Sequence, residues 1–505
     1  MESRIYLKEL SSYQKATVAQ KKRVGKSPYY DLTWLPSQTM REEMSEFLRY
    51  RGNEVSISTI YGECNYYKKI CRFIQNRAQG VVSFRDRQTD IWLKQFKVWM
   101  LEEKIPLTYE NKGVYGNLSM VPTHIIGYLK RIVEFTEKAA DDRTELEKDI
   151  WEIDKLDIFI RENLVQNIKT INFTRIPQHC IREEVKKGIF LNLQAEAITC
   201  VQKEMTAMRR FTSYLAEKEK NVLSCRDITR KVLEEYLIYL KTENTSTKHY
   251  HSDLNRLRSI LESIGKIYNY TNLNALFLNR DIPPTRPAEF KTYSDSELKR
   301  LNASIVKLDE QYARVMIIHQ MLGTRISDTL TLEMDCLYKE GPEIIIKIRQ
   351  VKTKTYQKPI SKELAELIQK AMDYTREKYG KTKYIFVSDK NPDRPLQYRA
   401  IQDKVISMIH REGLLDDNGR LFGFGTHMYR HYYGVKLTEM HLDDFTIAKL
   451  LGHSSIQNVK YYRRMSNQVL ADETRKVRQM LSDIILKNLD GWEPEYEQIR
   501  QNAGY

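Results

Sequence analysis

The sequence predicts a mainly α-helical protein, in which helical bundles precede a mainly helical domain with a small antiparallel sheet. Apolar residues recur at the 3.6-residue period of a helix over most of the chain, and β-branched runs replace this period mainly between about residues 343 and 387. A single core cannot serve 505 residues, since domains average about 150 residues. With 41% hydrophobic and 30% charged residues, the composition excludes a disordered or collagen-like chain.

The charge balance indicates a polyanionic partner. Lys and Arg number 82 against 67 Asp and Glu, a formal net charge of +15, which is typical of nucleic-acid-binding proteins. The alternative is a surface that is basic only for solubility. The six cysteines form no CxxC pair and no zinc pattern, so we expect reduced core cysteines and no metal centre. No apolar signal segment and no run of 18 apolar residues occurs, which predicts a cytoplasmic protein with no membrane partner.

The first elements are a basic N-terminal segment at 1–52 and a helical bundle at 53–140. The apolar stripe of the first helix has a 3.6-residue period, and it recurs 141 residues later in a second bundle at 195–280. Six positions correspond, namely Ile60, Cys64, Tyr67, Ile70, Cys71 and Ile74 with Val201, Met205, Met208, Phe211, Thr212 and Leu215. Two further helices repeat in the same way. The alternative is that amphipathic helices resemble each other by chance.

Two connecting segments separate these bundles from the rest of the chain. The first is a charged region at 141–194 with one strand-like run at 171–176. The second is an extended basic linker at 281–293, because its three prolines forbid a helix and its cations add charge: Pro283, Pro284 and Pro287 with Arg286 and Lys291, after Arg280.

The last domain, at 294–467, begins with a capping box made by Ser294 and Glu297. A buried helix near 313–322 follows. We then expect three strands, at 343–349, 356–360 and 384–387, with a Lys-rich turn between the first two. Helices resume from about residue 397, and the segment 468–505 holds a C-terminal helix whose apolar face is a candidate contact between protomers.

Several short segments of this domain place a cation, an imidazole or a phenol beside turn-forming glycine. Arg325 follows Gly323 at a helix start, which favours an anion. His427 and Arg430 lie three residues apart on one helix face. The remaining candidates are a turn lysine, a Leu-Gly-His segment and a tyrosine nine residues beyond it, at Lys352, His453 and Tyr462. Each alone is more often structural, but together and in this order they are specific.

These residues resemble the tyrosine recombinase family, also called phage integrases. The resemblance covers roughly 294–464 and, more loosely, a helical SAM-like core-binding domain at 195–289. It implies that Arg325 and Arg430 hold the scissile phosphate, Lys352 protonates the leaving 5′ oxygen and Tyr462 is the nucleophile. His427 and His453 would assist in acid-base and positioning roles, and His431 would buttress the site. The long N-terminal half and the segment Asn172 to Ile176 are similar to the transposon-borne branch.

The chemistry of phosphodiester cleavage explains, independently of the resemblance, why these residue types are needed. Two fixed guanidiniums can meet the charge that spreads over the phosphate oxygens in the transition state. A phenol with a pKa near 10 needs a base or a cationic pocket nearby. Because a proton and side-chain charges suffice, we expect neither a metal nor any other cofactor, and no ATP. The resulting 3′-phosphotyrosyl bond keeps the energy of the phosphodiester, so a second 5′ hydroxyl can reverse it on another strand.

Some alternatives stay open at this point. Tyr461 adjoins Tyr462, and only the spacing from His453 selects the second; Lys354 and Lys358 share the hairpin with Lys352. A type IB topoisomerase uses similar chemistry without joining two sites. A second alternative is not an enzyme but a DNA-binding regulator that has lost catalysis. The complete set of Arg, Lys, His, Arg, His and Tyr argues against it.

The expected partner is double-stranded DNA at two recombination sites, on which the resemblance implies assembly into a tetramer. A sister recombinase or an accessory DNA-bending protein is a further expected partner, and a bacterial, nucleoid-associated location follows. The candidate DNA contacts lie in the second bundle and in the linker: Lys248, Tyr250, Arg256, Arg258, Arg280, Arg286 and Lys291. The expected process is integration, excision or transposition of a mobile element.

Overall fold

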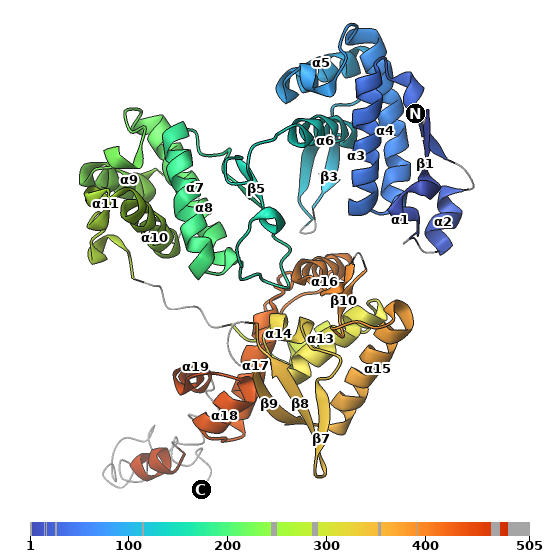
Figure 1. Cartoon of the computed structure of the whole chain (residues 1–505). Helices are drawn as coiled ribbons and strands as arrows, with labels where there is room; N and C mark the ends of the chain where they lie inside the picture. The colour runs from blue at the N-terminus through green and yellow to red at the C-terminus, as the bar shows by residue number, and fades with distance from the viewer. Residues whose placement is uncertain are drawn as a thin grey trace, which may run out of the picture. The chain divides into compact units, whose positions relative to one another are not determined.

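The computed structural model describes residues 3–14, 16, 18–25, 28–113, 116–243, 250–284, 291–351, 355–389, 391–465 and 475–482 (Figure 1). The chain divides into two compact units, Met1–Lys148 and Asp149–Tyr505. Over the described ranges the protein is mainly helical, and its strands form small antiparallel sheets, as the sequence predicts. No helix in these ranges is both long enough and apolar enough to cross a membrane.

The unit Met1–Lys148 is a helical bundle with two small strand pairs. Its helices are α1 (Ser11–Gln14), α2 (Val18–Val24), α3 (Gln38–Glu54), α4 (Ile57–Arg77), α5 (Thr89–Glu102) and α6 (His124–Ala139). Its strand pairs are β1 (Arg4–Tyr6) with β2 (Tyr29–Asp31), and β3 (Thr108–Lys112) with β4 (Leu118–Pro122). One hydrophobic core joins α3 to α6, and this core also takes in residues of the segment 1–52, such as Leu7 and Leu35.

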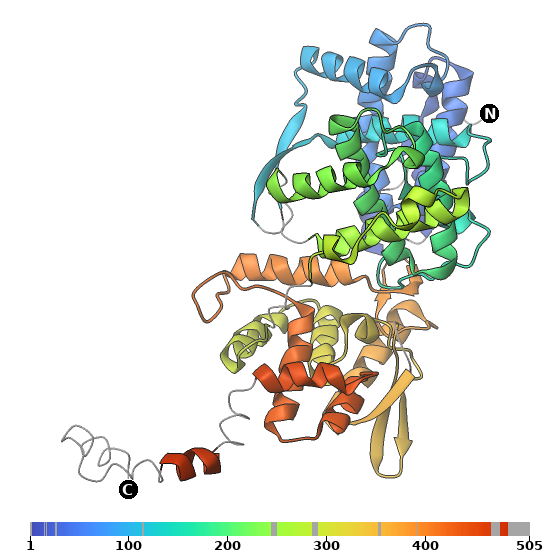
Figure 2. The same cartoon turned by 90° about the vertical axis from the view of Figure 1, so that its left-hand side faces the viewer.

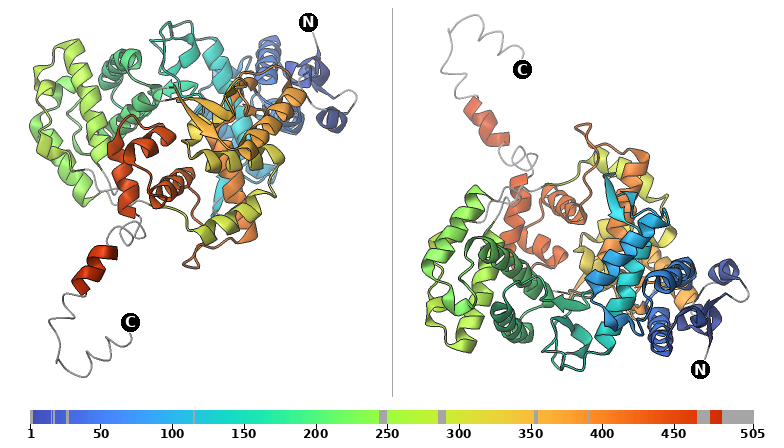
Figure 3. Two further views of the ribbon diagram at one scale, coloured as in Figure 1. Left: turned by 90° about the horizontal axis from the view of Figure 1, so that it is seen from below. Right: turned by 90° about the horizontal axis from the view of Figure 1, so that it is seen from above.

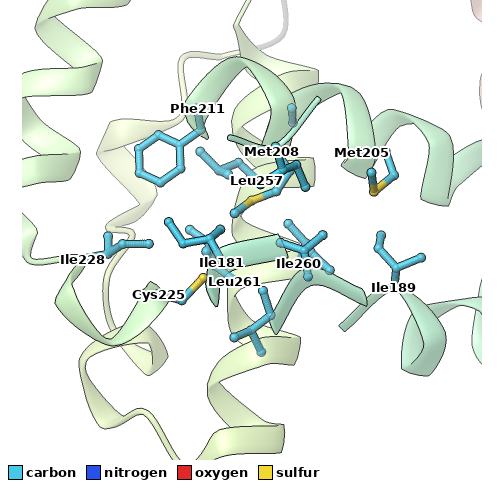
Figure 4. Close-up of a cluster of buried hydrophobic side chains, with 14 of the residues drawn as sticks. Ile181, Ile189, Met205, Met208, Phe211, Cys225, Ile228, Leu257, Ile260 and Leu261 are labelled. Atoms are coloured by element: carbon cyan, nitrogen blue, oxygen red, sulfur yellow. The ribbon is translucent and has the colours of Figure 1, made fainter. Parts of the chain in front are cut away.

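The second unit begins with another helical bundle. It contains β5 (Ile150–Glu152), β6 (Thr170–Asn172), α7 (His179–Ala195), α8 (Ile198–Lys218), α9 (Arg230–Thr242), α10 (His251–Tyr268) and α11 (Thr271–Asn274). Figure 3 shows its green helices grouped side by side, and α10 packs on both α7 and α8. Figure 4 shows the centre of this core, where Met208, Phe211, Cys225 and Leu257 meet.

The two bundles are structural repeats. Three helices of the second bundle begin 141 residues after their counterparts in the first, as these pairs of starts show: Gln38 and His179, Ile57 and Ile198, and Thr89 and Arg230. The short 3-10 turns Phe84–Asp86 and Cys225–Asp227 have the same offset. A buried carboxylate at the same offset accepts one hydroxyl and one backbone N–H in each copy: Glu43 from Ser83 and Phe84, and Glu184 from Ser224 and Cys225. Amphipathic helices that resembled each other by chance would not share this buried network, so the duplication inferred from the apolar stripes is confirmed.

The remainder of the second unit is a helical domain with a three-stranded sheet. Its helices are α12 (Asp295–Ile305), α13 (Glu310–Leu322), α14 (Ile326–Leu330), α15 (Lys362–Tyr379), α16 (Tyr398–Glu412), α17 (Thr426–Glu439), α18 (Asp444–Leu451) and α19 (Val459–Met465). The sheet has the order β7 (Leu337–Glu340), β8 (Glu343–Arg349) and β9 (Thr355–Ile360), all antiparallel, and is drawn in gold in Figure 2. The Ser294 hydroxyl accepts from the Glu297 N–H at 3.1 Å, and the Glu297 carboxylate accepts from the Ser294 N–H at 3.1 Å, which confirms the capping box.

Two expectations about strands were wrong in detail. The third strand of the sheet is β7, and the run 384–387 supplies only a bridge at Tyr384 and the first residue of β10 (Val387–Ser388), which pairs with β11 (Asn391–Pro395). The run 171–176 is a strand only to Asn172, because Phe173 and Ile176 turn into the core instead. Apolar β-branched runs fill buried turns as readily as strands, and their pattern does not separate the two.

Some sequence predictions concern residues that the structure describes only in part. The C-terminal helix is described only at 475–482, where Val477, Met480 and Leu481 are exposed; the rest of its apolar face lies outside the described residues. The domain boundaries drawn from the sequence stay predictions.

Candidate active site

Arg325 is held at a tight turn between two helices. Gly323 ends α13 with φ +60°, and a Cβ there would come within 2.4 Å of the Tyr433 ring, so glycine is required on both counts. The turn places Arg325 as the residue before α14, as the sequence predicts. Its Nη1 lies 3.7 Å from the Asp328 carboxylate and, although buried, makes no hydrogen bond within the described part of the chain.

Arg430 lies deep in the same region. Its side chain is 1% exposed, and its guanidinium donates to the backbone carbonyls of Gly323 at 3.0 Å and Leu451 at 2.7 Å. These carbonyls belong to the loops that carry Arg325 and His453, so one buried side chain ties both loops to α17. Carbonyls are neutral, so these two bonds do not balance the positive charge of Arg430, and burial of that charge lowers its pKa.

His453 and Tyr462 stack on one another. Their ring centroids are 6.1 Å apart with an interplanar angle of 10°. Burial, with the charges of Arg430 and Arg325, lowers the pKa of His453 to about 3, so its ring is neutral at physiological pH. Its Nδ1 is buried and has no hydrogen-bond partner among the described residues.

Tyr462 is packed against α17 from its place on α19. Its side chain is 4% exposed, and a Cβ at Gly434 would come within 2.8 Å of its ring. Burial raises the pKa of Tyr462, and the nearby charges of Arg430 and Arg325 lower it in part. The phenol therefore faces the two arginines that the sequence assigned to the phosphate.

The two histidines of α17 lie at the edge of this cluster. The His427 and His431 ring centroids are 4.5 Å apart, and the His431 centroid is 6.3 Å from that of Tyr462. His431 Nδ1 donates to the Lys291 carbonyl at 2.8 Å, which fixes its ring. The structure thus brings together Arg325, Arg430, His453 and Tyr462, with His431 beside them and His427 next to His431.

The lysine of the hairpin turn is the one predicted catalytic residue without a described position, since Lys352 and Lys354 lie outside the described residues. The third candidate, Lys358, is on β9 and is 4% exposed. Its ammonium donates to the Leu322 carbonyl and lies 5.0 Å from the Tyr433 ring centroid. Burial and the charge of Arg430 lower the pKa of Lys358 to about 7. Lys358 therefore stabilises the turn before Arg325 through its hydrogen bond to the Leu322 carbonyl.

Sequence reasoning missed two polar residues of this site. Asp328 is 1% exposed, accepts from the Val351 N–H at 3.2 Å and pairs with Arg325. Its position three residues after Arg325, on the same helix face, was a usable signal. Tyr356 is on β9, and its buried hydroxyl has no hydrogen-bond partner within the described ranges. Nothing local marks it, because only the fold brings β9 to the arginines.

The candidate DNA contacts are dispersed. Arg256 pairs with Glu196 at 2.7 Å, and Arg258 pairs with Glu262 at 2.7 Å on its own helix. Tyr250 is half-buried beside the core of the second bundle, whereas Arg280 and Lys291 are exposed. Lys248 and Arg286 lie outside the described residues. The assignment of all seven to DNA stays a prediction.

An open hollow on the second bundle was not predicted. It lies between α8 and α9 and combines cations with aromatic rings, namely Arg175, Arg209 and Arg210 with Tyr214, Tyr236 and Tyr239. Such a combination suits a polyanion with planar groups.

Comparisons with known proteins agree with this geometry. Residues 291–468 match the phage integrase family. Transposase B from transposon Tn554 of Staphylococcus aureus is 24% identical over 422 residues, which cover 82% of this chain and 66% of that protein. The chain thus spans slightly less than two thirds of this relative's length.

Two further proteins are similar over a shorter range. The tyrosine recombinase XerA of Pyrococcus furiosus is 21% identical over 321 residues, which cover 62% of this chain and all of XerA. A crystal structure of the XerH site-specific recombinase bound to its difH substrate has 18% identity and a TM-score of 0.44, and covers 60% of this chain and 91% of that one. Residues 291–468 therefore form a domain that matches the phage integrase family, the tyrosine recombinases.

Proposed function

We propose that this protein cleaves and rejoins DNA strands through a covalent bond between Tyr462 and a 3′ phosphate. The Tyr462 oxygen attacks the scissile phosphorus, a P–O bond to tyrosine forms, and the bond to the 5′ oxygen breaks. The tyrosine proton passes to a base, and the 5′ oxygen takes a proton from an acid. Both bonds are phosphoesters, so the reverse reaction on another strand needs no ATP.

The observation that carries this proposal is the packing of Tyr462 beside Arg325 and Arg430, whose combined charge is only partly balanced by the Asp328 carboxylate. Arg430 donates to two neutral carbonyls and also interacts with the Tyr462 phenol, and Arg325 has a buried nitrogen without a hydrogen bond among the described residues. A phosphate placed between them would receive charge-assisted hydrogen bonds without reorganisation of the site. A structural ion-pair network would instead have its charges balanced.

The protonation states suit this chemistry. Burial raises the pKa of the Tyr462 phenol, so the hydroxyl keeps its proton until a base removes it. His453 is neutral and stacked on the phenol, which leaves a ring nitrogen able to orient the proton. Lys352 is the proposed acid for the 5′ oxygen, and His427 and His431 support the site. Neither a metal nor another cofactor has a step in this scheme.

The test uses a duplex from the ends of the element that encodes the protein, nicked near the cleavage site so that the cut strand cannot religate. We expect a protein–DNA adduct on a denaturing gel, with and without EDTA. The Tyr462→Phe variant should form none, because it lacks the attacking oxygen. The Tyr461→Phe variant is the matched control and should form the adduct.

Two other results would count against the scheme. An adduct with Tyr462→Phe would move the nucleophile elsewhere. Tight binding without any adduct from the unsubstituted chain would favour the regulator that has lost catalysis.

The biological process proposed is integration, excision or transposition of a mobile element, at two DNA sites held by a tetramer. The similarity to a transposase supports the mobile element. A sister recombinase or an accessory DNA-bending protein is part of the same proposal. Joining of two sites, rather than relaxation of supercoils, separates it from a type IB topoisomerase.

The first unit is proposed as an additional DNA-binding domain. It repeats the second bundle, and the exposed face of α4 carries Lys68, Lys69 and Arg72, for which no ion pair with a carboxylate occurs in the described part of the chain. From Cys64 to Arg85 the sequence contains no Asp or Glu. Lys68 and Lys69 correspond to Arg209 and Arg210 at the 141-residue offset, so both copies keep two adjacent cations on this helix. This conserved pair supports contact with the DNA backbone.

A further inference from the structure

We infer that Tyr356 is a further catalytic residue, whose hydroxyl donates a hydrogen bond to a non-bridging oxygen of the scissile phosphate. The inference rests on the proposed phosphotyrosyl reaction and adds a neutral donor to its two arginines. It concerns a residue of β9 that no motif of the sequence singles out.

The ring of Tyr356 is placed by the turn before His453. Gly452 has φ +63°, and a Cβ there would come within 2.5 Å of the Tyr356 Cε1. Gly452 stands between Leu451, whose carbonyl accepts from Arg430 at 2.7 Å, and His453. The phenol thus packs on the loop that joins two residues of the site, while β8 holds its backbone through the pairing of Ile348 with Tyr356.

The hydroxyl of Tyr356 is buried and makes no hydrogen bond within the described residues. An unpaired buried hydroxyl costs about 1–3 kcal/mol, so such groups are rare without a ligand to satisfy them. Three other buried polar atoms of the same site share this condition: Arg325 Nη1, Asp328 Oδ2 and His453 Nδ1. Arg325 Nη1 and the Tyr356 hydroxyl are unsatisfied donors beside two arginines that a single carboxylate, Asp328, only partly balances, and such an arrangement suits a bound anion.

The charges around Tyr356 agree with the role of a donor. Burial raises its pKa well above the ordinary value, with Arg430, Asp328 and Arg325 as the closest charged groups that act on it. The hydroxyl therefore keeps its proton at every pH at which the protein works. A protonated hydroxyl without a partner donates to the phosphate oxygen as negative charge grows there in the transition state.

Removal of the Tyr356 hydroxyl should lower the rate of catalysis without lowering the stability of the protein. Tyr356→Phe deletes one oxygen that has no hydrogen-bond partner among the described residues, so the melting temperature should stay or rise. The rate of adduct formation on the nicked duplex should fall roughly 10- to 100-fold, toward the loss seen when one such donor is removed from an enzyme. DNA affinity should change little.

Tyr429→Phe is the matched control. Tyr429 is also in this domain, and its hydroxyl is also buried and without a partner in the described ranges. Its ring packs in the core against Tyr293 at 5.0 Å and His319 at 5.8 Å. The same chemical change there should leave the rate of adduct formation unchanged.

A substrate with one non-bridging oxygen of the scissile phosphate replaced by methyl identifies the contact. Of the two stereoisomers, one lacks the oxygen that Tyr356 contacts, and on that duplex Tyr356→Phe should cost nothing further. An equal loss on both stereoisomers with a lower melting temperature would mean a structural role and overturn the inference. A wild-type rate for Tyr356→Phe would overturn it as well. If the unsubstituted chain forms no adduct on the normal duplex, the proposed function itself fails, which is a distinct result.

Discussion

Two lysines of one hairpin have different proposed roles. Lys358 is buried behind the turn that carries Arg325 and bonds the Leu322 carbonyl, so its ammonium is already used. Lys352, in the turn, is the proposed acid. Burying the Lys358 ammonium without a carboxylate partner among the described residues costs free energy. Such groups persist where function needs them, and here the need is to hold the turn that carries Arg325.

A sulfur-substituted duplex distinguishes these two roles. With sulfur in place of the 5′ bridging oxygen, the leaving group is a thiolate that needs no proton, because thiols ionise near pH 8.5. We expect Lys352→Ala to lose about 100-fold in adduct formation on normal DNA, as general acids contribute about 10²- to 10⁴-fold, and to recover on the sulfur duplex. Lys358→Met should be slow on both duplexes, because it disturbs the arginine turn. Recovery of Lys358→Met instead would exchange the two assignments.

His319 makes the catalytic domain sensitive to acid. It is wholly buried, its Nε2 donates to the Thr426 carbonyl at 3.1 Å, and its Nδ1 accepts from the Thr329 hydroxyl at 2.9 Å. Burial lowers its pKa from 6.5 to about 4. Between these values the unfolded chain binds a proton that the native protein does not, so stability is lost as the pH falls from about 6.5 to 4.

The expected loss through His319 at pH 5 is about 2 kcal/mol relative to pH 7, at 1.36 kcal/mol per pKa unit. Urea unfolding at both values measures it by the change in midpoint. The His319→Phe variant should be less stable overall but should show a smaller decrease between pH 7 and pH 5. An unchanged decrease would assign the acid sensitivity to other groups, of which His453 is the next candidate.

At the scale of elements, the contact between α17 and α19 sets the position of Tyr462, the proposed nucleophile. Gly434 lets the Tyr462 ring lie directly on α17, since an added Cβ would be 2.8 Å from it. Gly434→Ala should therefore displace α19 and slow adduct formation at least 10-fold, as small misplacements of reacting groups are costly. DNA binding should persist, and helix stability should not suffer, because Ala favours a helix by about 1 kcal/mol over Gly.

Gly423→Ala is the control for this substitution, since no atom lies within 4 Å of an added Cβ there. Equal rates for Gly434→Ala and the unsubstituted protein would show that the packing of α19 on α17 does not set the rate.

At the scale of the whole molecule, the repeated bundles predict two separate contacts with DNA. We expect the chain to bind a duplex extended by about 20 base pairs on each side at least 10-fold more tightly than one limited to the core site. Charge reversal on α4, in Lys68→Glu with Lys69→Glu and Arg72→Glu, should remove this gain. The slope of log affinity against log salt should fall by about 2 to 3, at 0.9 per phosphate contact.

The control for this variant reverses three exposed charges elsewhere in the same unit, at Lys97, Lys104 and Lys112. It should keep the gain from the longer duplex. Equal affinity of the unsubstituted chain for the two duplexes would contradict a DNA-binding role for Met1–Lys148, whatever the result for cleavage.

Local sequence patterns were sufficient to predict much of the secondary structure. The capping box at Ser294, the helix ending at Leu322 and the hairpin of β8 and β9 follow from side-chain spacing and turn chemistry, which act between near neighbours. The 141-residue repeat was also legible, because both copies need the same apolar stripe to form the same core. Motif order likewise marked Arg325, His427, Arg430, His453 and Tyr462 as one set.

The tertiary structure alone decided how these residues meet. No spacing indicates that Arg430 bonds the carbonyls of Gly323 and Leu451, or that Tyr356 lies against Gly452. Contacts of this kind join segments about 20 to 110 residues apart, and they depend on how helices and sheet pack rather than on any local preference. The sequence by itself therefore determined, by residue type and order, which residues are candidates for the chemistry. The packing of α17, α19 and β9 decided that Arg430 donates to neutral carbonyls and that the buried Tyr356 hydroxyl has no hydrogen-bond partner among the described residues.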